Sequence, residues 1–172
     1  MTSKLIIIRG NSGSGKTTIA KEVCNRIGDG LSDGTMLVQQ DTLRRDMLGK
    51  TSVIELIELL VEFGRKQNRI VVLEGILGFK KYGMMLNKLV SSFDESHVYY
   101  LDIPFEETLV RHASKPNAHE FGEKEMREWW KEKDYLGVPG EKILQADKSV
   151  GDVVREIIND TGAVNLTNSH LT

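Results

Sequence analysis

The stretch Gly10-Asn11-Ser12-Gly13-Ser14-Gly15-Lys16-Thr17, followed by Thr18, decides the fold of this chain. It satisfies the phosphate-binding pattern G-x-x-x-x-G-K-[ST] at every fixed position, between an apolar run at residues 5–8 and a helix-like run at residues 17–27. Glycines let successive backbone N–H groups point into one anion-binding hollow at the positive end of the following helix. Lys16 is then placed to reach the β- and γ-phosphates, and the Thr17 hydroxyl to ligate Mg²⁺. The sequence therefore predicts that residues 10–18 bind a nucleoside triphosphate.

The size and composition of the chain are those of one globular domain. It has 172 residues, 40% of them hydrophobic, which is enough for a sizeable core. The formal net charge of -2 argues against a protein that coats nucleic acid, so no nucleic-acid partner is expected. The single cysteine, Cys24, excludes a disulfide framework within the chain and is predicted to be buried on a helix. No apolar run has the length of a signal peptide core or a membrane span, so we expect a cytoplasmic location without a membrane partner.

Strand-like and helix-like segments alternate along the chain. Short apolar runs predict strands at residues 5–8, 36–38, 70–73, 98–101 and 142–144. Helical spacing of apolar residues predicts helices at residues 17–27, 42–48, 53–65, 79–92, 105–112, 123–135 and 150–158. Strands that are apolar on both faces and alternate with helices indicate an α/β fold, a three-layer α/β/α sandwich around a five-stranded parallel sheet. We expect one domain over residues 1–160, with a lid at about 111–125 and a polar C-terminal tail at 161–172.

Charged residues follow the second and third predicted strands, where ligands bind in sheets of this kind. Asp41 follows the second strand, and Arg44 lies one helical turn further on the same face, whereas Arg45 points elsewhere and is expected to be solvated. Asp41 and Arg44 are suited to orient an acceptor hydroxyl and hold an anionic substrate; the alternative is that Asp41 only caps a helix. Glu74 ends the third strand and can join Thr17 around Mg²⁺, or it faces solvent or caps the next segment. Asp41 and Glu74 compete for the roles of base and metal anchor, and the sequence leaves both assignments open.

Residues 111–119 form a basic, polar segment that suits a lid closing over phosphates. Arg111, Lys115 and Arg127 are the cations available to a nucleotide or acceptor, or else they are solvated. His112 and His119, seven residues apart without a nearby cysteine, do not predict a metal site.

Met126, Trp129 and Trp130 lie at helical spacing within the predicted helix at 123–135. Such a stripe usually packs into the core; the functional alternative is that Trp130 forms a wall of the substrate pocket. Asp102 ends the fourth strand and is expected to shape the turn into the next helix.

The phosphate-binding loop, the Asp41-x-x-Arg44 step, the Val-Val-Leu-Glu-Gly strand and the Arg-bearing lid resemble the small P-loop kinases. The zeta-toxin-like phosphotransferases, with chloramphenicol phosphotransferase and the kinase domain of phage polynucleotide kinase, are most similar; shikimate, gluconate and adenylate kinases are more distant. The resemblance covers about residues 4–158 and implies a P-loop NTPase fold like that of nucleoside monophosphate kinases. It implies that Asp41 is the catalytic base, that Arg44 holds the acceptor, and that Arg111 contacts ATP. The chain departs from many relatives in lacking a second closely spaced lid arginine and in carrying Glu74 on the third strand.

Motif and resemblance together predict a kinase that uses ATP and Mg²⁺ to phosphorylate a hydroxyl of a small molecule, as a monomer or homodimer. The catalytic candidates are Lys16, Asp41 and Arg111, and the metal candidates are Thr17, Asp41 and Glu74. The nucleotide candidates are residues 10–18 with Arg111 and Lys115, and the substrate candidates are Asp41, Arg44, Glu74, Arg127 and Trp130.

Three alternatives stay open: a polynucleotide 5′-hydroxyl kinase, a zeta-toxin-like sugar-nucleotide kinase, and a non-catalytic nucleotide-binding module. A GTPase-like switch is disfavoured, because Asn87-Lys88-Leu89-Val90 lacks the aspartate of N-K-x-D.

Overall fold

A five-stranded, fully parallel sheet forms the centre of the computed structural model, which describes residues 2–27, 34–49, 52–67, 69–114 and 118–162. The strands are β1 (Lys4–Gly10), β2 (Thr35–Gln39), β3 (Ile70–Gly75), β4 (Glu95–Asp102) and β5 (Lys142–Gln145). Their order across the sheet is β2-β3-β1-β4-β5, with β1 in the middle. The predicted α/β fold with five parallel strands is confirmed.

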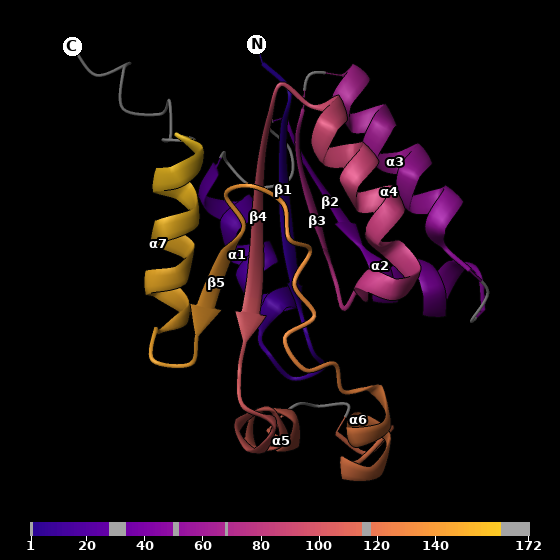
Figure 1. Ribbon diagram of the computed structural model, residues 1–172, viewed down its shortest axis with the longest axis vertical. Helices are drawn as coiled ribbons and strands as arrows, with labels where there is room; N and C mark the ends of the chain where they lie inside the picture. The colour runs from indigo at the N-terminus through magenta and orange to yellow at the C-terminus, as the bar shows by residue number, and fades with distance from the viewer. Residues whose placement is uncertain (1, 28–33, 50–51, 68, 115–117, 163–172) are drawn as a thin grey trace.

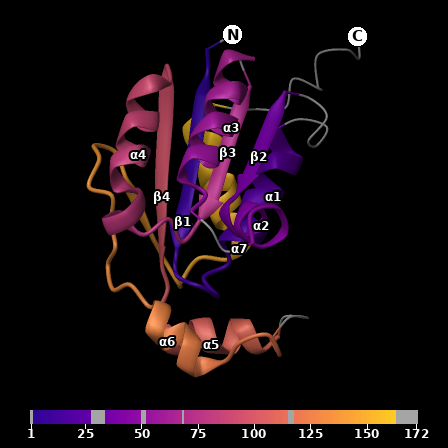
Figure 2. The same cartoon turned by 90° about the vertical axis from the view of Figure 1, so that its right-hand side faces the viewer.

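Helices cover both faces of the sheet and the edge at which its strands end. They are α1 (Lys16–Ile27), α2 (Gln40–Thr42) with the π-helical turn η1 (Leu43–Met47), α3 (Ile54–Lys66), α4 (Phe79–Ser92), α5 (Phe105–Ala113), α6 (Glu123–Trp129) and α7 (Val150–Thr161). Helices α1 and α7 lie on one face, and α3 and α4 on the other (Figure 1). Helices α5 and α6 lie beyond the carboxyl ends of the strands, as Figure 2 shows from the side. None of the helices in the described ranges combines the length and apolar character that a membrane crossing requires.

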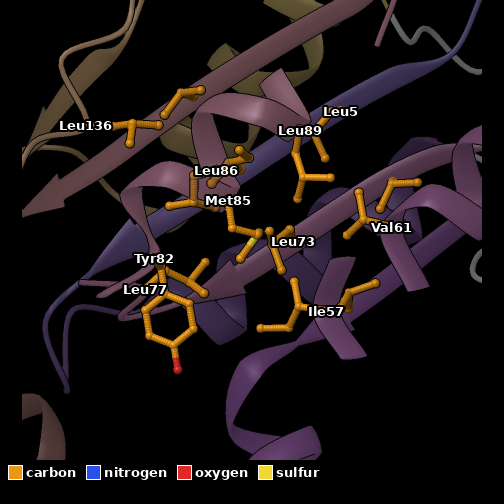
Figure 3. Close-up of a cluster of buried hydrophobic side chains, with 14 of the residues drawn as sticks. Leu5, Ile57, Val61, Leu73, Leu77, Tyr82, Met85, Leu86, Leu89 and Leu136 are labelled. Carbon is orange, nitrogen blue, oxygen red and sulfur yellow. The ribbon is translucent and has the colours of Figure 1, made fainter. Parts of the chain in front are cut away.

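The two core layers follow from the alternation of side chains along the central strand. Leu5 and Ile7 of β1 pack with α3 and α4, while Ile6 and Ile8 pack with α1 and α7. All four side chains are fully buried. Figure 3 shows the first of these clusters, in which residues of β1, α3 and α4 converge on Leu73 of β3. A sheet buried on both faces fixes the position of each strand end, and with it the loop that follows β1.

Two predicted helix boundaries were wrong by three residues or more. The helix predicted at 123–135 ends at Trp129, because residues 130–141 run back along the sheet in irregular conformation (Figure 1). Tertiary hydrogen bonds hold this segment: Lys131 N donates to Asn11 Oδ1 over 2.9 Å, and Tyr135 Oη donates to Asp102 Oδ2 over 2.9 Å. We call residues 130–141 the strap.

The C-terminal boundary also differs. The last helix continues past the predicted residue 158 to Thr161, which is fully buried. The Lys4 ammonium group donates to the Thr161 carbonyl and fixes this end of α7 against the start of β1. Residues 163–172 of the predicted tail lie outside the described residues.

Candidate active site

The phosphate-binding loop leads from the end of β1 into the first turn of α1. Lys16 is the first residue of α1, and its ammonium group, largely buried, donates to the Asn11 carbonyl over 3.1 Å. Gly13 has a φ of 81°, and a Cβ there would come within 2.5 Å of the Thr108 carbonyl oxygen of α5. Only glycine fits this conformation and this close approach, so Gly13 allows the loop to lie directly against α5. Since α1 begins directly after the loop, its first backbone N–H groups lack partners within the helix and favour an anion there.

A buried carboxylate lies beside the loop hydroxyl. Glu74 is only 2% exposed, and its Oε1 accepts hydrogen bonds from Thr17 Oγ1 over 3.1 Å and from Gln39 Nε2 over 3.0 Å. Sheet register explains the meeting, since Glu74 of β3 pairs with Ile8 of β1 on one side and with Gln39 of β2 on the other. The structure therefore brings together Thr17 and Glu74, two of the three residues predicted to hold a metal.

The third predicted metal residue, Asp41, is held differently. It lies in α2, two residues beyond Gln39, and its Oδ1 is 3.4 Å from Arg44 Nη2. Both side chains are about half exposed, at 51% for Asp41 and 44% for Arg44. Asp41 thus pairs with Arg44 just beyond the end of β2, whereas Thr17 and Glu74 are paired with each other. Arg45, expected to be solvated, forms an ion pair with Glu120 over 3.2 Å that joins η1 to the segment before α6.

Arg111 of α5 reaches the phosphate-binding loop. Its Nη1 donates to the Ser14 carbonyl over 3.1 Å, and its Nη2 contacts Glu107 one turn earlier on the same helix. A Cβ on Gly15 would lie 3.6 Å from Nη1, so the guanidinium group stands over the middle of the loop. A guanidinium group therefore lies beside the loop that is predicted to bind phosphates.

A cavity of about 440 Å³ opens on the β5 side of the loop. Its walls come from the loop itself, from Ile103 after β4, from Arg111 of α5 and Ser114 just after it, and from the end of β5 and the turn that follows. The residues from this part of the chain are Gln145, the last residue of β5, and Lys148 and Ser149 of the turn. These three residues were not predicted from the sequence. The rule that ligands bind beyond strand ends could have identified them, because Gln145 is the last residue of β5.

Two predicted substrate residues, Arg127 of α6 and Trp130 at the start of the strap, pack against Phe105 of α5. Arg127 pairs with Glu123 over 2.7 Å, and its guanidinium carbon lies 4.3 Å from the centre of the Phe105 ring. Trp130 packs edge-on against the same ring at 5.0 Å between centroids and lines a second cavity of about 240 Å³. Its neighbours Met126 and Trp129 do not share one buried face, since Met126 is 2% and Trp129 41% exposed. Lys115 lies outside the described residues.

Asp102, expected to shape the turn into the next helix, accepts a hydrogen bond from Tyr135 in the strap. Among the described residues, no three His, Cys, Asp or Glu side chains converge in a way that could hold a metal ion. A divalent cation at Thr17 and Glu74 would therefore need further ligands from phosphate oxygens and water, which is how Mg²⁺ is usually held beside nucleotides.

Comparison with known proteins adds to this geometry. A protein-family model described as AAA domain matches residues 5–74, and no curated protein matches the sequence. The APS kinase CysC of Mycobacterium tuberculosis, in complex with AMPPNP and APS, has a TM-score of 0.68 and 18% identity over 94% of this chain and 98% of that chain. A sugar kinase from Janibacter sp. has a TM-score of 0.61 and 16% identity over 95% of this chain and 96% of that chain. A chain of the Pnkp1/Rnl/Hen1 RNA repair complex has a TM-score of 0.55 and 18% identity over 80% of this chain and 50% of that chain.

At these identities the likeness to solved structures concerns the fold. It extends over nearly the whole chain, and the family model covers the loop, α1 and the strands up to Glu74. The chain is therefore similar to the small P-loop kinases in its α/β fold, and its residues 5–74, which include the phosphate-binding loop, match the AAA domain model.

Proposed function

We propose that this chain is an ATP- and Mg²⁺-dependent kinase that transfers the γ-phosphate to a hydroxyl group of a small molecule. The contact between Thr17 Oγ1 and the buried Glu74 carboxylate carries the proposal. A purely structural loop has no need for a carboxylate in this position, whereas a nucleotide-bound cation does.

The nucleotide would lie across the loop with its base in the 440 Å³ cavity. A cavity of this size is in the usual range for sites that enclose small ligands. The triphosphate would then run over the loop amides toward Lys16, whose ammonium group neutralises charge on the transferred phosphoryl group. Arg111 would add a second cation above the loop, since its guanidinium group already lies at Ser14 and Gly15. The AMPPNP complex of the similar APS kinase supports ATP as the nucleotide.

Thr17 and Glu74 would hold Mg²⁺, Thr17 through its hydroxyl and Glu74 through a water molecule. Bound there, Mg²⁺ would neutralise charge on the β- and γ-phosphates. Gln39 would keep the Glu74 carboxylate in place by donating to the oxygen that Thr17 also contacts.

The acceptor would bind on the opposite side of the loop from the base. Asp41 would align the acceptor hydroxyl and accept its proton, and Arg44 would hold an anionic part of the acceptor. The ion pair between them is long and half exposed, so an anionic acceptor can replace Asp41 as the partner of Arg44 at little cost. This division of labour assigns Glu74 to the metal and Asp41 to the hydroxyl.

A coupled assay of ADP formation tests the proposal. Purified protein is given Mg·ATP and panels of nucleosides, sugars, aminoglycosides, shikimate-like acids and 5′-hydroxyl oligonucleotides. We expect turnover that rises with one class of hydroxyl compound and falls by at least about 100-fold in Asp41→Asn, a loss typical of general-base removal. Asp46→Asn, a change of the same kind nearby, is the control and should keep full activity. Tight ATP binding without turnover on any panel would instead indicate a non-catalytic module.

A polynucleotide is the second candidate acceptor. The likeness to a chain of an RNA repair complex favours it, although that chain is twice as long as the part that aligns. The oligonucleotide panel distinguishes the two candidates directly. We also propose that the protein is a cytoplasmic monomer or homodimer. Light scattering of the purified protein tests the oligomeric state.

A further inference from the structure

Arg9 is a fully buried arginine directly before the phosphate-binding loop. It lies in β1 on the same face as Leu5 and Ile7, where the alternation of the strand calls for another apolar side chain. Burial lowers the pKa of Arg9, and the carboxylates of Asp134 and Glu141 oppose that shift. A buried charge is costly unless several groups satisfy it. The contacts of Arg9 therefore indicate what stabilises its charge inside the core.

Arg9 contacts both the turn that follows β3 and the strap. Its Nε and Nη2 both donate to the Leu77 carbonyl, over 3.2 and 3.0 Å. Nη2 also donates to Asp134 Oδ2 over 2.8 Å, and Nη1 lies 3.6 Å from Glu141 Oε1. The guanidinium carbon lies 5.7 Å from the centre of the Tyr100 ring. A lysine could not make this forked contact, because its ammonium group is a single point charge.

The turn at residues 75–78 is held from its other side by α2. Leu77, buried and with a positive φ of 43°, donates its N–H to Gln40 Oε1 over 3.1 Å. A Cβ on Gly75 would lie only 2.4 Å from the same Gln40 oxygen, so glycine is needed for this approach. A non-glycine residue at this φ is strained, and it persists only where its surroundings hold it. Leu77 is thus clamped between Arg9 and Gln40.

The neighbouring residue of Gln40 is Asp41, the proposed base. Two hydrogen bonds therefore connect Arg9, next to the loop, through Leu77 to Gln40, whose chain neighbour is Asp41. The strap also contacts the segment after this turn, because Asp134 Oδ2 accepts a second hydrogen bond from Phe79 N at the start of α4 over 2.9 Å. In Figure 2 the orange strap lies on the left and α2 on the right, with β1 and β3 between them.

We propose that Arg9 is a positioning residue that fixes the turn at 75–78 and helix α2 relative to the phosphate-binding loop. Its consequence for phosphoryl transfer rests on the proposed function: the clamp sets the distance between the acceptor beside Asp41 and the γ-phosphate over Lys16. A displacement of about 1 Å between reacting groups can lower a rate about 100-fold. Loss of the clamp should therefore affect turnover more than nucleotide binding.

Hydrogen exchange followed by mass spectrometry tests the clamp without any substrate. In Arg9→Met, amides at 75–79 and 40–47 should exchange at least about tenfold faster, while those of α7 and β5 exchange as in the wild type. Gln40→Met removes the other side of the clamp and should give the same pattern, which keeps the test decisive if Arg9→Met does not fold. The matched control is Arg26→Met, an exposed arginine paired with Glu22 on α1, which should change neither segment. Unchanged exchange at 75–79, or an equal rise throughout the chain, would overturn the proposal.

Kinetics separate this inference from the proposed function. With a positioning role, Arg9→Met lowers kcat at least about tenfold while the Kd for ATP changes less than about threefold, and Arg9→Lys restores only part of kcat. Equal losses in ATP binding and kcat would argue against the clamp as a positioning device. If the wild type neither binds nor hydrolyses ATP, the proposed function fails, and the exchange pattern alone still decides whether Arg9 holds the turn.

Discussion

Replacing Glu74 with glutamine tests the proposed metal site with almost no change in shape. The carboxylate is buried and accepts from Thr17 and Gln39, and the glutamine oxygen can accept both hydrogen bonds again. What changes is one negative charge beside the phosphate-binding loop. The expected result is a weaker apparent affinity for Mg²⁺ in a protein that remains folded.

The size of the effect follows from the position of Glu74. Removal of a residue that orients or reaches a metal through water usually costs about 10- to 100-fold, or about 1.4 to 2.7 kcal/mol. Stability should change little, because two opposing contributions nearly cancel. Each hydrogen bond to the carboxylate weakens by about 1 kcal/mol when its acceptor becomes neutral. The desolvation cost of a buried charge disappears at the same time.

The assay measures ADP formation against Mg²⁺ concentration at saturating ATP, with calorimetry of ATP binding in EDTA beside it. Glu74→Gln should shift the Mg²⁺ midpoint upward by about 10- to 100-fold and leave metal-free ATP binding within about twofold of the wild type. Glu22→Gln, at an exposed glutamate of α1, is the control and should shift neither quantity. An unchanged Mg²⁺ midpoint in Glu74→Gln would refute the reasoning.

Three further predictions concern other parts of the chain. Arg111→Ala removes the guanidinium group above Ser14 and should raise the Kd for ATP about tenfold without lowering the melting temperature. Calorimetry measures the Kd, and an unchanged value would mean that Arg111 does not contact the nucleotide. Burial raises the pKa of the Cys24 thiol from 9.0 to about 12, so the unfolded chain releases this proton first and the free energy of unfolding falls across that range. Urea midpoints should therefore fall less steeply with pH in Cys24→Ala, and parallel curves would count against this cause. Ser149→Ala removes the oxygen that accepts from Asp152 N at the start of α7 and should cost about 1 kcal/mol in urea unfolding, whereas no loss would mean that the cap is not formed in solution.

Local sequence rules predicted the parts of the fold in which one segment determines its own structure. The glycine pattern and the apolar runs on either side of it fixed the loop between β1 and α1. Continuous apolar strands predicted a sheet buried on both faces. The position of Glu74 beside Thr17 was also accessible, because the ends of adjacent parallel strands meet at one edge.

The strap was not accessible from local rules. Helical spacing of Met126, Trp129 and Trp130 favoured a helix through this segment, but contacts with Asn11 and Asp102 hold it in another conformation. Those partners are more than thirty residues away in sequence, so no window of the chain contains both sides of the interaction. Arg9 was overlooked for the same reason, because its partners lie in two distant segments.

The central claim is that residues 10–18 bind a nucleoside triphosphate, and calorimetry of Mg·ATP with wild-type protein and Lys16→Met tests it most directly. We expect one site per chain in the wild type, weaker binding of AMP than of ATP, and at least a tenfold (about 1.4 kcal/mol) loss of ATP affinity in Lys16→Met. No heat on mixing ATP with the wild type, or equal affinity in Lys16→Met, would contradict it.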